Sequence, residues 1–345
     1  MSENMIYLDR NENNYGPAPA CYEVLKTADL TLLSWYTKAF ERGVKSILSE
    51  RIAKDFEIEE SRVALGYGAE DLLKQIVQCY LWADDKLMIP SYSWWYYKKI
   101  ADEVGGKNVE YPLIKGKNEF YYDVDALLKL YEQEKPKIIF ISSPNNPTGN
   151  SISKDDLHLV LEATKNTIVV LDEAYVFEDD HKYVNNLLNK FDRLVVVRTF
   201  SKYFALAGVR IGYAVQGKEF SELTKFTQRY LGFNRLSEEI AIAALNSPKY
   251  YKDVASKMNE DKELFYKELN ALDDFNVFKS DANFILVEIN PEIKKPLKEF
   301  LLERKLSIKF MNEEVLNSHL RITLGTQEQN KLLVEAIKEF ASVKI

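Results

Sequence analysis

The sequence predicts an α/β protein in which helices cover both faces of a mainly parallel sheet, joined to a smaller α+β domain. Apolar runs of strand length alternate with segments of helical period through the middle of the chain. Several runs are apolar at every position, which is typical of strands buried on both faces. This alternation of strands and helices favours a parallel sheet.

The strands expected in the sheet are short, and the run at 137–142 is the clearest of them because it is almost continuously apolar. The run at 86–89 is closed by Pro90. The full set of expected strands lies at residues 63–65, 86–89, 109–113, 137–142, 167–171, 194–197 and 209–215.

The helices expected between these strands carry their own signals. Apolar residues recur at helical spacing over 70–81, and the helical segment 91–104 ends at two glycines. Ser153 and Asp156 resemble a capping box that opens a helix at 157–163. A further helix is expected at 124–134.

After Phe220 the pattern changes, and long helical stretches run to residue 269. A strand at 282–289, a helix at 296–304, a strand at 320–324 and a final helix to residue 341 are expected beyond them. A chain of 345 residues fits about two domains. We expect a large domain over 30–245 and a small domain made of 1–29 and 246–345, closely packed because no flexible linker separates them.

Composition argues against several kinds of function. The chain has 46 lysines and arginines, 53 aspartates and glutamates and a net charge of −7, a poor match for nucleic acid. Two cysteines, Cys21 and Cys79, and three histidines make a disulfide framework, a metal site and most histidine-based triads unexpected. Without a secretory signal or a bilayer-spanning run, a cytoplasmic protein that binds no membrane is expected.

Polar residues follow the ends of five predicted strands. Ligands of such sheets lie beyond the carboxyl ends of the strands, so these residues are expected to meet at one rim. The five segments are 66–68, 90–92, 143–149, 172–175 and 198–202. Taken singly, each has an ordinary structural reading, such as a turn, a helix cap or a solvated lysine. A nicotinamide-binding fingerprint is incomplete, because Asp71 stands where its last glycine belongs.

Taken together, the rim residues match one ligand. Lys202 can bind an aldehyde, Asp172 can hold a protonated ring nitrogen, and Tyr175 and Asn146 can bind a ring hydroxyl. The ring would stack on Tyr92. Its phosphate would be held by the helix amides starting near Ala69 and by Thr199, Ser201 and Arg210. This ligand is pyridoxal 5′-phosphate.

The chain contains, in this order, the motifs SPNNPTG, DEAY and TFSKYFALAGVRIGY. Together they resemble the fold-type I pyridoxal-phosphate aminotransferases. The segment RNENNYGPAP near the N-terminus resembles the histidinol-phosphate aminotransferase branch of that family. The resemblance extends from about Leu8 to Leu324 and implies an enzyme that transfers amino groups with this cofactor.

The resemblance also implies roles for individual residues. Lys202, Asp172 and Tyr175 would be catalytic, with Lys202 binding the cofactor and moving protons. Arg321 would clamp the carboxylate of the amino acid, and Tyr36 would reach the cofactor phosphate of a neighbouring subunit, which implies a homodimer with shared sites. Other cofactor contacts would come from Gly68, Ala69, Glu70, Tyr92, Asn146, Thr199, Ser201 and Arg210, and other substrate contacts from Asn11, Tyr15, Arg229 and Arg235.

Departures from the family pattern leave the amino acceptor open. Trp94 and Trp95 crowd the segment after Tyr92, and the segment 229–235 lacks the proline that the family carries. L-Glutamate is the expected donor, and imidazole acetol phosphate or another small phosphorylated ketone is the expected acceptor. Two alternatives are decarboxylation of an amino acid of the phosphoserine or phosphothreonine type on the same scaffold, and a non-catalytic cofactor-binding protein.

Overall fold

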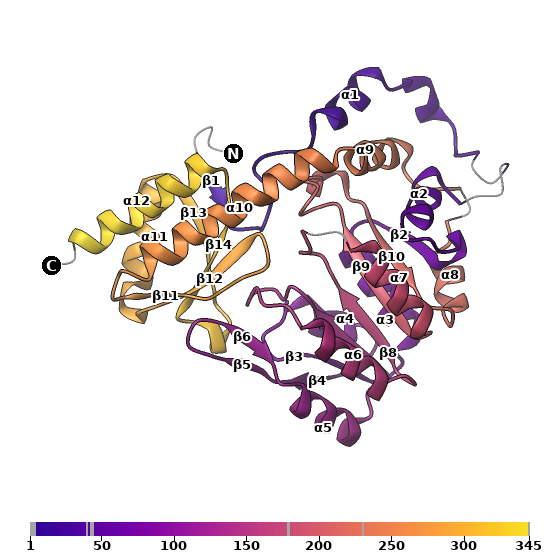
Figure 1. Ribbon diagram of the computed structural model, residues 1–345, viewed down its shortest axis with the longest axis horizontal. Coiled ribbons are helices and arrows are strands. Elements are labelled where there is room, and N and C mark those ends of the chain that lie inside the picture. The colour runs from indigo at the N-terminus through magenta and orange to yellow at the C-terminus, as the bar shows by residue number, and fades with distance from the viewer. Residues whose placement is uncertain (1–4, 39–40, 42–44, 178–179, 230, 344–345) are drawn as a thin grey trace.

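The structure is a computed structural model that describes residues 5–38, 41, 45–177, 180–229 and 231–343. It is built on two large sheets, each with its own apolar core. The long helix α10 (Pro248–Leu269) extends from the side of the second sheet towards the first (Figure 1). The two sheets together frame the site described below.

The first sheet confirms the predicted mainly parallel arrangement. β10 is antiparallel to both of its neighbours, whereas the other neighbouring strands pair in parallel. The order across the sheet is β2 (Val63–Gly66), β10 (Gly212–Gln216), β9 (Leu194–Thr199), β8 (Ile168–Asp172), β7 (Ile138–Ser142), β3 (Lys86–Pro90) and β4 (Lys107–Tyr111).

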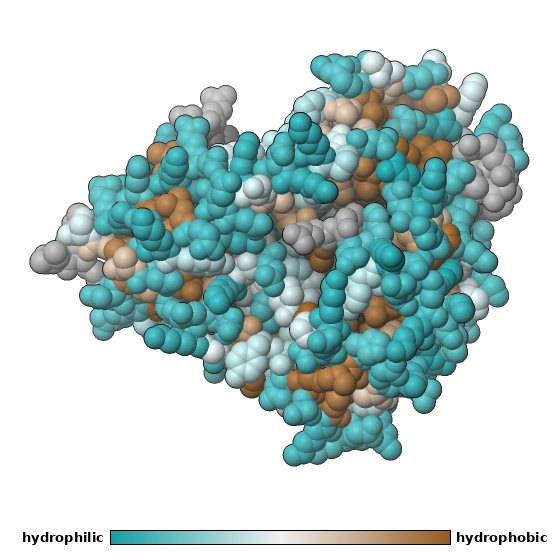
Figure 2. Space-filling view, viewed as in Figure 1, coloured by the Kyte–Doolittle hydropathy of each residue, from teal (hydrophilic) through white to brown (hydrophobic). Residues whose placement is uncertain are grey.

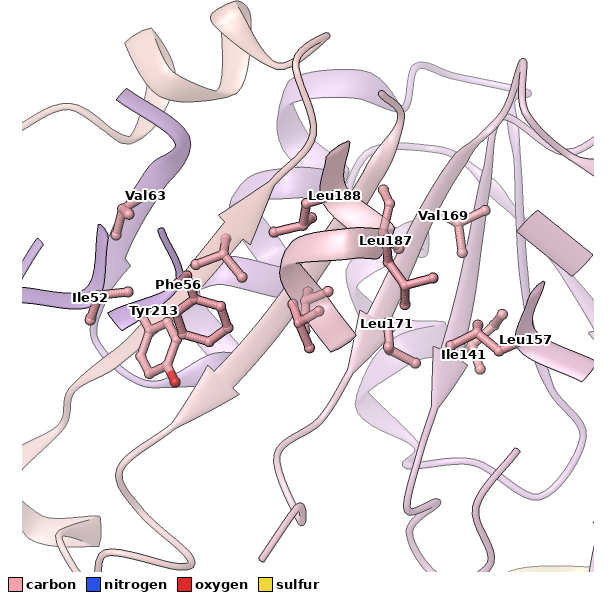
Figure 3. Close-up of a cluster of buried hydrophobic side chains, with 14 of the residues drawn as sticks. Ile52, Phe56, Val63, Ile141, Leu157, Val169, Leu171, Leu187, Leu188 and Tyr213 are labelled. Carbon is pink, nitrogen blue, oxygen red and sulfur yellow. The ribbon is translucent and has the colours of Figure 1, made fainter. Parts of the chain in front are cut away.

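Both faces of this sheet are buried, as its continuously apolar strands require. In β8, Val169 and Leu171 belong to one apolar cluster, whereas Ile168 and Val170 belong to another. Successive side chains of a strand point to opposite faces, so each cluster occupies its own side of the sheet. Figure 3 shows part of the first cluster, where Leu187 lies near the central strands.

Helices from along the chain complete the two clusters. The first cluster includes residues of α1 (Pro19–Thr27), α2 (Ile47–Asp55), α5 (Val124–Glu134), α6 (Lys154–Ala163), α7 (His181–Lys190) and α9 (Arg235–Leu245). The second includes residues of α3 (Ala69–Tyr80), α4 (Tyr96–Asp102) and α8 (Ser221–Thr227). The Ser153 hydroxyl accepts from the Asp156 amide at the start of α6, as the predicted cap requires.

The second sheet has five strands and pairs both ends of the chain. β1 lies parallel to β13, and the other neighbouring strands are antiparallel. The order is β1 (Ile6–Leu8), β13 (Leu306–Phe310), β14 (His319–Thr323), β12 (Phe284–Ile289) and β11 (Phe275–Val277). Its core also includes residues of α10, α11 (Lys294–Glu303) and α12 (Gln327–Val343). A separate hairpin is formed by β5 (Leu113–Lys115) and β6 (Phe120–Tyr122).

The long helical stretch expected over 220–269 is divided into α8, α9 and α10. α8 ends before Gln228, whose backbone is extended (φ −63°, ψ 128°), and Gly232, with a left-handed φ of +86°, lies before the start of α9. Pro248 opens α10 at a position where a helix does not need the missing N–H.

Two other expected elements are shorter in the structure. The strand expected at 209–215 begins at Gly212, because Arg210 has a left-handed φ of 55° and an extended strand cannot include it. The helix expected at 91–104 begins at Tyr96. The Ser91 amide and hydroxyl are already used by Tyr111 and Leu113, which hold the start of this segment as a loop.

Polar residues cover most of the face shown in Figure 2, and its apolar residues form small separate patches. Among the described helices, none combines the length and the apolar character that crossing a membrane requires.

Candidate active site

A cavity of about 890 Å³ lies where the carboxyl ends of β7, β8 and β9 face β13, β14 and the N-terminal segment 9–12. Its volume is ordinary for a site that holds a cofactor and a small substrate. Eleven of the residues predicted from the sequence line it: Asn11, Ala69, Glu70, Asn146, Asp172, Tyr175, Thr199, Ser201, Lys202, Arg210 and Arg321.

One end of the cavity is built to hold an anion. Helix α3 starts here at Gly68, whose φ of +93° and missing side chain leave the first helix amides uncapped. A Cβ at Gly68 would come within 2.7 Å of Arg210 Nη2, so the guanidinium lies directly against the start of the helix. Arg210 Nη1 also donates to Ser201 Oγ over 3.4 Å, and Thr199 Oγ1 donates to the same oxygen over 3.0 Å. Free amides, hydroxyls and a guanidinium are the groups that bind phosphate.

Asp172 is a buried carboxylate at the end of β8. Its Oδ2 accepts from the Tyr97 hydroxyl over 2.5 Å, and its Oδ1 accepts from the Ala174 amide over 3.0 Å. Burial raises the pKa of Asp172, and these two hydrogen bonds oppose the rise. Because no cationic side chain pairs with it among the described residues, the carboxylate can accept a positively charged ring N–H.

Two amides hold the Tyr175 hydroxyl at the centre of the cavity. Asn11 Nδ2 donates to it over 3.1 Å and Asn146 Nδ2 over 3.3 Å. A phenol oxygen that already accepts two hydrogen bonds still has its own proton to donate. Asn11 is itself fixed, with a left-handed φ of 56° and a backbone amide that donates to Thr323 Oγ1 over 2.8 Å.

Lys202 lies beside this tyrosine. Its Nζ donates to the Arg10 carbonyl over 3.0 Å and lies 5.5 Å from the centre of the Tyr175 ring. A carbonyl partner leaves the amine available for chemistry, because such a bond does not neutralise it as an ion pair would.

Arg321 is a partly buried cation that is oriented by neutral groups. Its Nη1 donates to Asn146 Oδ1 over 2.5 Å and its Nη2 to the Asp9 carbonyl over 3.0 Å, while its buried Nε has no partner. Burial lowers the pKa of Arg321, and no carboxylate of the described chain pairs with it. Lys309, its register partner on β13, also lines the cavity. An uncompensated guanidinium beside an ammonium favours a substrate anion at this point.

Tyr92, Tyr15 and Tyr36 are not among the residues that line the cavity. Tyr92 packs edge-on against Phe120, with ring centres 5.3 Å apart. The Tyr15 hydroxyl accepts from the Gln327 amide over 3.2 Å, beside the second sheet. Tyr36 is 68% exposed.

Arg229 and Arg235 also lie outside the lining of the cavity. Arg229 pairs with Asp71 over 3.2 Å and lies 4.6 Å from the centre of the Tyr67 ring. Arg235 donates to the Tyr36 carbonyl over 3.3 Å. Their guanidinium groups are thus held near the start of α3 and near Tyr36, away from Arg321.

Several lining residues were not predicted from the sequence. The most relevant are Tyr97, which holds Asp172, and Lys309, which accompanies Arg321. Trp94 and Trp95 also line the cavity, although the sequence predicted only that they crowd the segment after Tyr92. The alternating pattern over 306–310 could have revealed Lys309, because a strand there places it on the polar face.

The fold and this cavity define a pyridoxal-phosphate-dependent enzyme of fold type I, since the lysine, the buried aspartate and the phosphate cradle fit that cofactor. The family model "Aminotransferase class I and II" matches residues 3–337, and the chain belongs to this family. It is a pyridoxal-phosphate-dependent aminotransferase that is similar to histidinol-phosphate aminotransferases.

Individual relatives support this assignment. The chain is 35% identical to histidinol-phosphate aminotransferase 2 of Archaeoglobus fulgidus over 340 residues, which cover 98% of this chain and 93% of the relative. It is 30% identical to the Ruminiclostridium cellulolyticum enzyme, over 96% of this chain and 91% of the relative.

Two solved structures share the fold. Histidinol-phosphate aminotransferase from Sinorhizobium meliloti in complex with pyridoxal-5′-phosphate has a TM-score of 0.85 at 22% identity, covering 99% of this chain and 92% of that one. L-threonine-O-3-phosphate decarboxylase from Porphyromonas gingivalis has a TM-score of 0.82 at 21% identity, covering 98% and 100%.

Proposed function

We propose that this aminotransferase moves the amino group of L-glutamate to imidazole acetol phosphate or to another small phosphorylated ketone. The observation that carries the proposal is the partly buried Arg321, without an ion-pair partner among the described residues and opposite Lys309, in the same cavity as Lys202 and Asp172. One anionic group of each substrate, carboxylate or phosphate, fits this pair of cations. The names of two curated relatives are consistent with such an acceptor.

The proposed roles follow from the contacts around the cavity. Bound pyridoxal phosphate supplies an aldehyde that takes up the amino group and a ring that accepts electrons from the substrate α-carbon. Lys202 binds that aldehyde in the resting enzyme and moves the proton at the α-carbon. Asp172 keeps a proton on the ring nitrogen, and Tyr175 donates its proton to the ring oxygen. Arg210, Ser201, Thr199 and the amides of Ala69 and Glu70 hold the phosphate.

A spectral screen tests the proposed substrates. Holoenzyme is mixed with single amino acids, and conversion of the cofactor to its pyridoxamine form is followed by absorbance. L-Glutamate is expected to convert it, and imidazole acetol phosphate or another phosphorylated ketone is expected to reverse the change. Release of carbon dioxide from phosphoserine or phosphothreonine, without conversion by glutamate, would instead assign the alternative decarboxylase activity.

Arg321→Lys is expected to lower kcat/KM for L-glutamate roughly 10- to 100-fold, because a bidentate clamp is replaced by a single point charge. Steady-state kinetics measure this effect, while the absorbance of the bound cofactor should stay unchanged. Lys309→Gln is the matched variant on the neighbouring strand, and its effect should fall mainly on the phosphorylated ketone. Unchanged glutamate kinetics in Arg321→Lys would remove the proposed carboxylate site.

Tyr97→Phe is expected to slow the glutamate half-reaction about tenfold. The Tyr97 hydroxyl is a buried donor that lowers the pKa of Asp172, so its loss raises that pKa, draws the ring proton towards the carboxylate and leaves the ring nitrogen less protonated. Stopped-flow absorbance between pH 6 and 9 measures the rate and the titration of the bound cofactor. Tyr111→Phe is the control, since Tyr111 is equally buried but donates to the Phe140 carbonyl. Equal effects of both variants would mean that Tyr97 only supports packing.

The proposed assembly is a homodimer with shared sites, and the exposed apolar residues of segment 25–36 support it. Leu25, Leu30, Leu33, Trp35 and Tyr36 are each more than half exposed, an unusual concentration for a surface that water covers. Sedimentation equilibrium is expected to give twice the chain mass, and the double variant L33E/W35E should sediment as a monomer with little activity. A fully active monomer would exclude shared sites.

Two further expectations stay proposals. The division into a large domain over 30–245 and a small one over 1–29 and 246–345 is supported by the two sheets with separate cores. A cytoplasmic location is supported by Cys21 and Cys79, which are both free thiols, as a reducing compartment would keep them.

A further inference from the structure

A second cavity, of about 440 Å³, lies between α10 and the first sheet, and it shares no lining residue with the candidate active site. Ser143, Glu173 and Arg198 line it from the ends of β7, β8 and β9, and Lys262 lines it from α10. Asp172 and Glu173 are neighbours in the chain but line different cavities. The volume is within the range of pockets that bind small molecules.

Four of the charged groups in this cavity are already paired. Arg198 Nε donates to Glu173 over 2.7 Å in a buried ion pair, and Lys154 Nζ pairs with Asp180 over 2.7 Å. Within each pair the two opposite charges cancel, so the pairs offer a ligand little net charge. What remains to recognise a ligand is therefore the set of groups that are not paired.

Lys262 and Asp281 are those groups. The Lys262 side chain is 8% exposed, and its amine makes no hydrogen bond or ion pair within the described part of the chain. The Asp281 side chain is exposed to solvent and its carboxylate also has no protein partner there, while its backbone amide donates to the Gly149 carbonyl over 2.8 Å. The two groups face the same cavity without forming an ion pair with each other.

An unpaired amine at this depth is costly. Burial lowers the pKa of Lys262 to about 8, while the carboxylates of Asp281 and Glu263 raise it only in part. An anionic oxygen placed on the amine would remove the cost. A cation placed on the exposed Asp281 carboxylate would add a second charged contact. Apolar side chains also line the cavity, among them Leu157, Val176 and Val184.

We propose that this cavity binds a free α-amino acid, with its carboxylate on Lys262, its ammonium on Asp281 and an apolar side chain against the wall. A zwitterion matches an unpaired amine and a carboxylate that line the same cavity, whereas a simple anion would contact the amine alone and be repelled by Asp281. The site lies outside the active-site cavity, so it does not depend on which ketone the enzyme uses.

The test uses isothermal calorimetry with L-leucine as the probe. Holoenzyme is first treated with borohydride, so that the cofactor cannot exchange with the added amine. One saturable site per chain is expected. The analogues 4-methylpentanoate, which lacks the ammonium, and 3-methylbutylamine, which lacks the carboxylate, should each bind at least about tenfold more weakly. Absence of saturable binding of leucine, or equal binding of all three, would overturn the proposal.

A second readout follows from the amine. Burial lowers the pKa of Lys262 and a bound carboxylate would raise it again, so binding at pH 8.5 should take up protons. The apparent enthalpy should therefore differ between buffers of different ionisation enthalpy. Leucine that binds without proton uptake would place the site elsewhere.

Variants complete the test. Lys262→Met should abolish leucine binding and raise the melting temperature, because it removes a buried unpaired amine. Asp281→Asn should weaken binding about tenfold, and it alters an exposed side chain that the fold does not need. Lys252→Met, at an exposed position of the same helix, should bind leucine normally. A marked loss of stability in Lys262→Met, or normal binding in it, would show that the amine serves the fold and not a ligand.

Discussion

Lys202→Ala is expected to reduce turnover at least about a thousandfold, the largest effect of any single substitution in this enzyme. The reason is that one amine both binds the cofactor aldehyde and moves the proton at the substrate α-carbon. Among the residues that the structure describes, Lys309 of the second sheet is the one other lysine that lines the cavity. Steady-state assays with L-glutamate measure the loss, and the visible absorbance of the covalently bound cofactor should disappear with it.

Chemical rescue is the control for this variant. A small amine such as methylamine can enter the space left by the side chain and restore part of the proton transfer in proportion to its concentration and basicity. Circular dichroism should be unchanged, because Lys202 is partly exposed and its main contact is a single carbonyl. Turnover by Lys202→Ala at the rate of the unaltered enzyme would contradict the role proposed for this residue.

Asp172→Asn is expected to slow the glutamate half-reaction at least about a hundredfold while leaving the fold in place. The amide has the shape of the carboxylate, and its oxygen can still accept from the Ala174 amide while its NH2 donates to the Tyr97 hydroxyl, but it cannot stabilise a protonated ring nitrogen. Single-turnover absorbance measures the rate of the half-reaction directly.

The sign of the pKa shift makes the second prediction specific. Burial raises the pKa of Asp172, and a protonated ring nitrogen brought against it would lower that pKa again. A cofactor methylated on the ring nitrogen carries a permanent positive charge and should therefore restore much of the rate of Asp172→Asn. Equal rates for the aspartate and asparagine enzymes would contradict this account of the site.

The sheet and its rim could be predicted because their signals are local. β7, β8 and β9 are short, almost continuously apolar runs. Asp172 is the last residue of β8, and Asn146 and Lys202 follow the ends of β7 and β9 within a few residues. Since parallel strands end at the same edge, Asn146, Asp172 and Lys202 could be placed together without knowing the rest of the fold.

The parts that could not be predicted depend on long-range packing. Tyr97, at the start of α4, donates to Asp172 at the end of β8, although the two residues are 75 positions apart in the chain. Lys309 joins Arg321 only through the register of β13 and β14. Tyr92 packs edge-on against Phe120, a ring that the hairpin of β5 and β6 places beside it, and its stacking on the cofactor ring stays a prediction.

Borohydride reduction followed by peptide mapping tests the central claim most directly. Purified protein is saturated with pyridoxal phosphate, reduced, digested and analysed by mass spectrometry. The structure predicts one cofactor adduct per chain, on the amine of Lys202. A reduced protein that carries no adduct, or carries it on a different lysine, would contradict the assignment of this cavity as the active site.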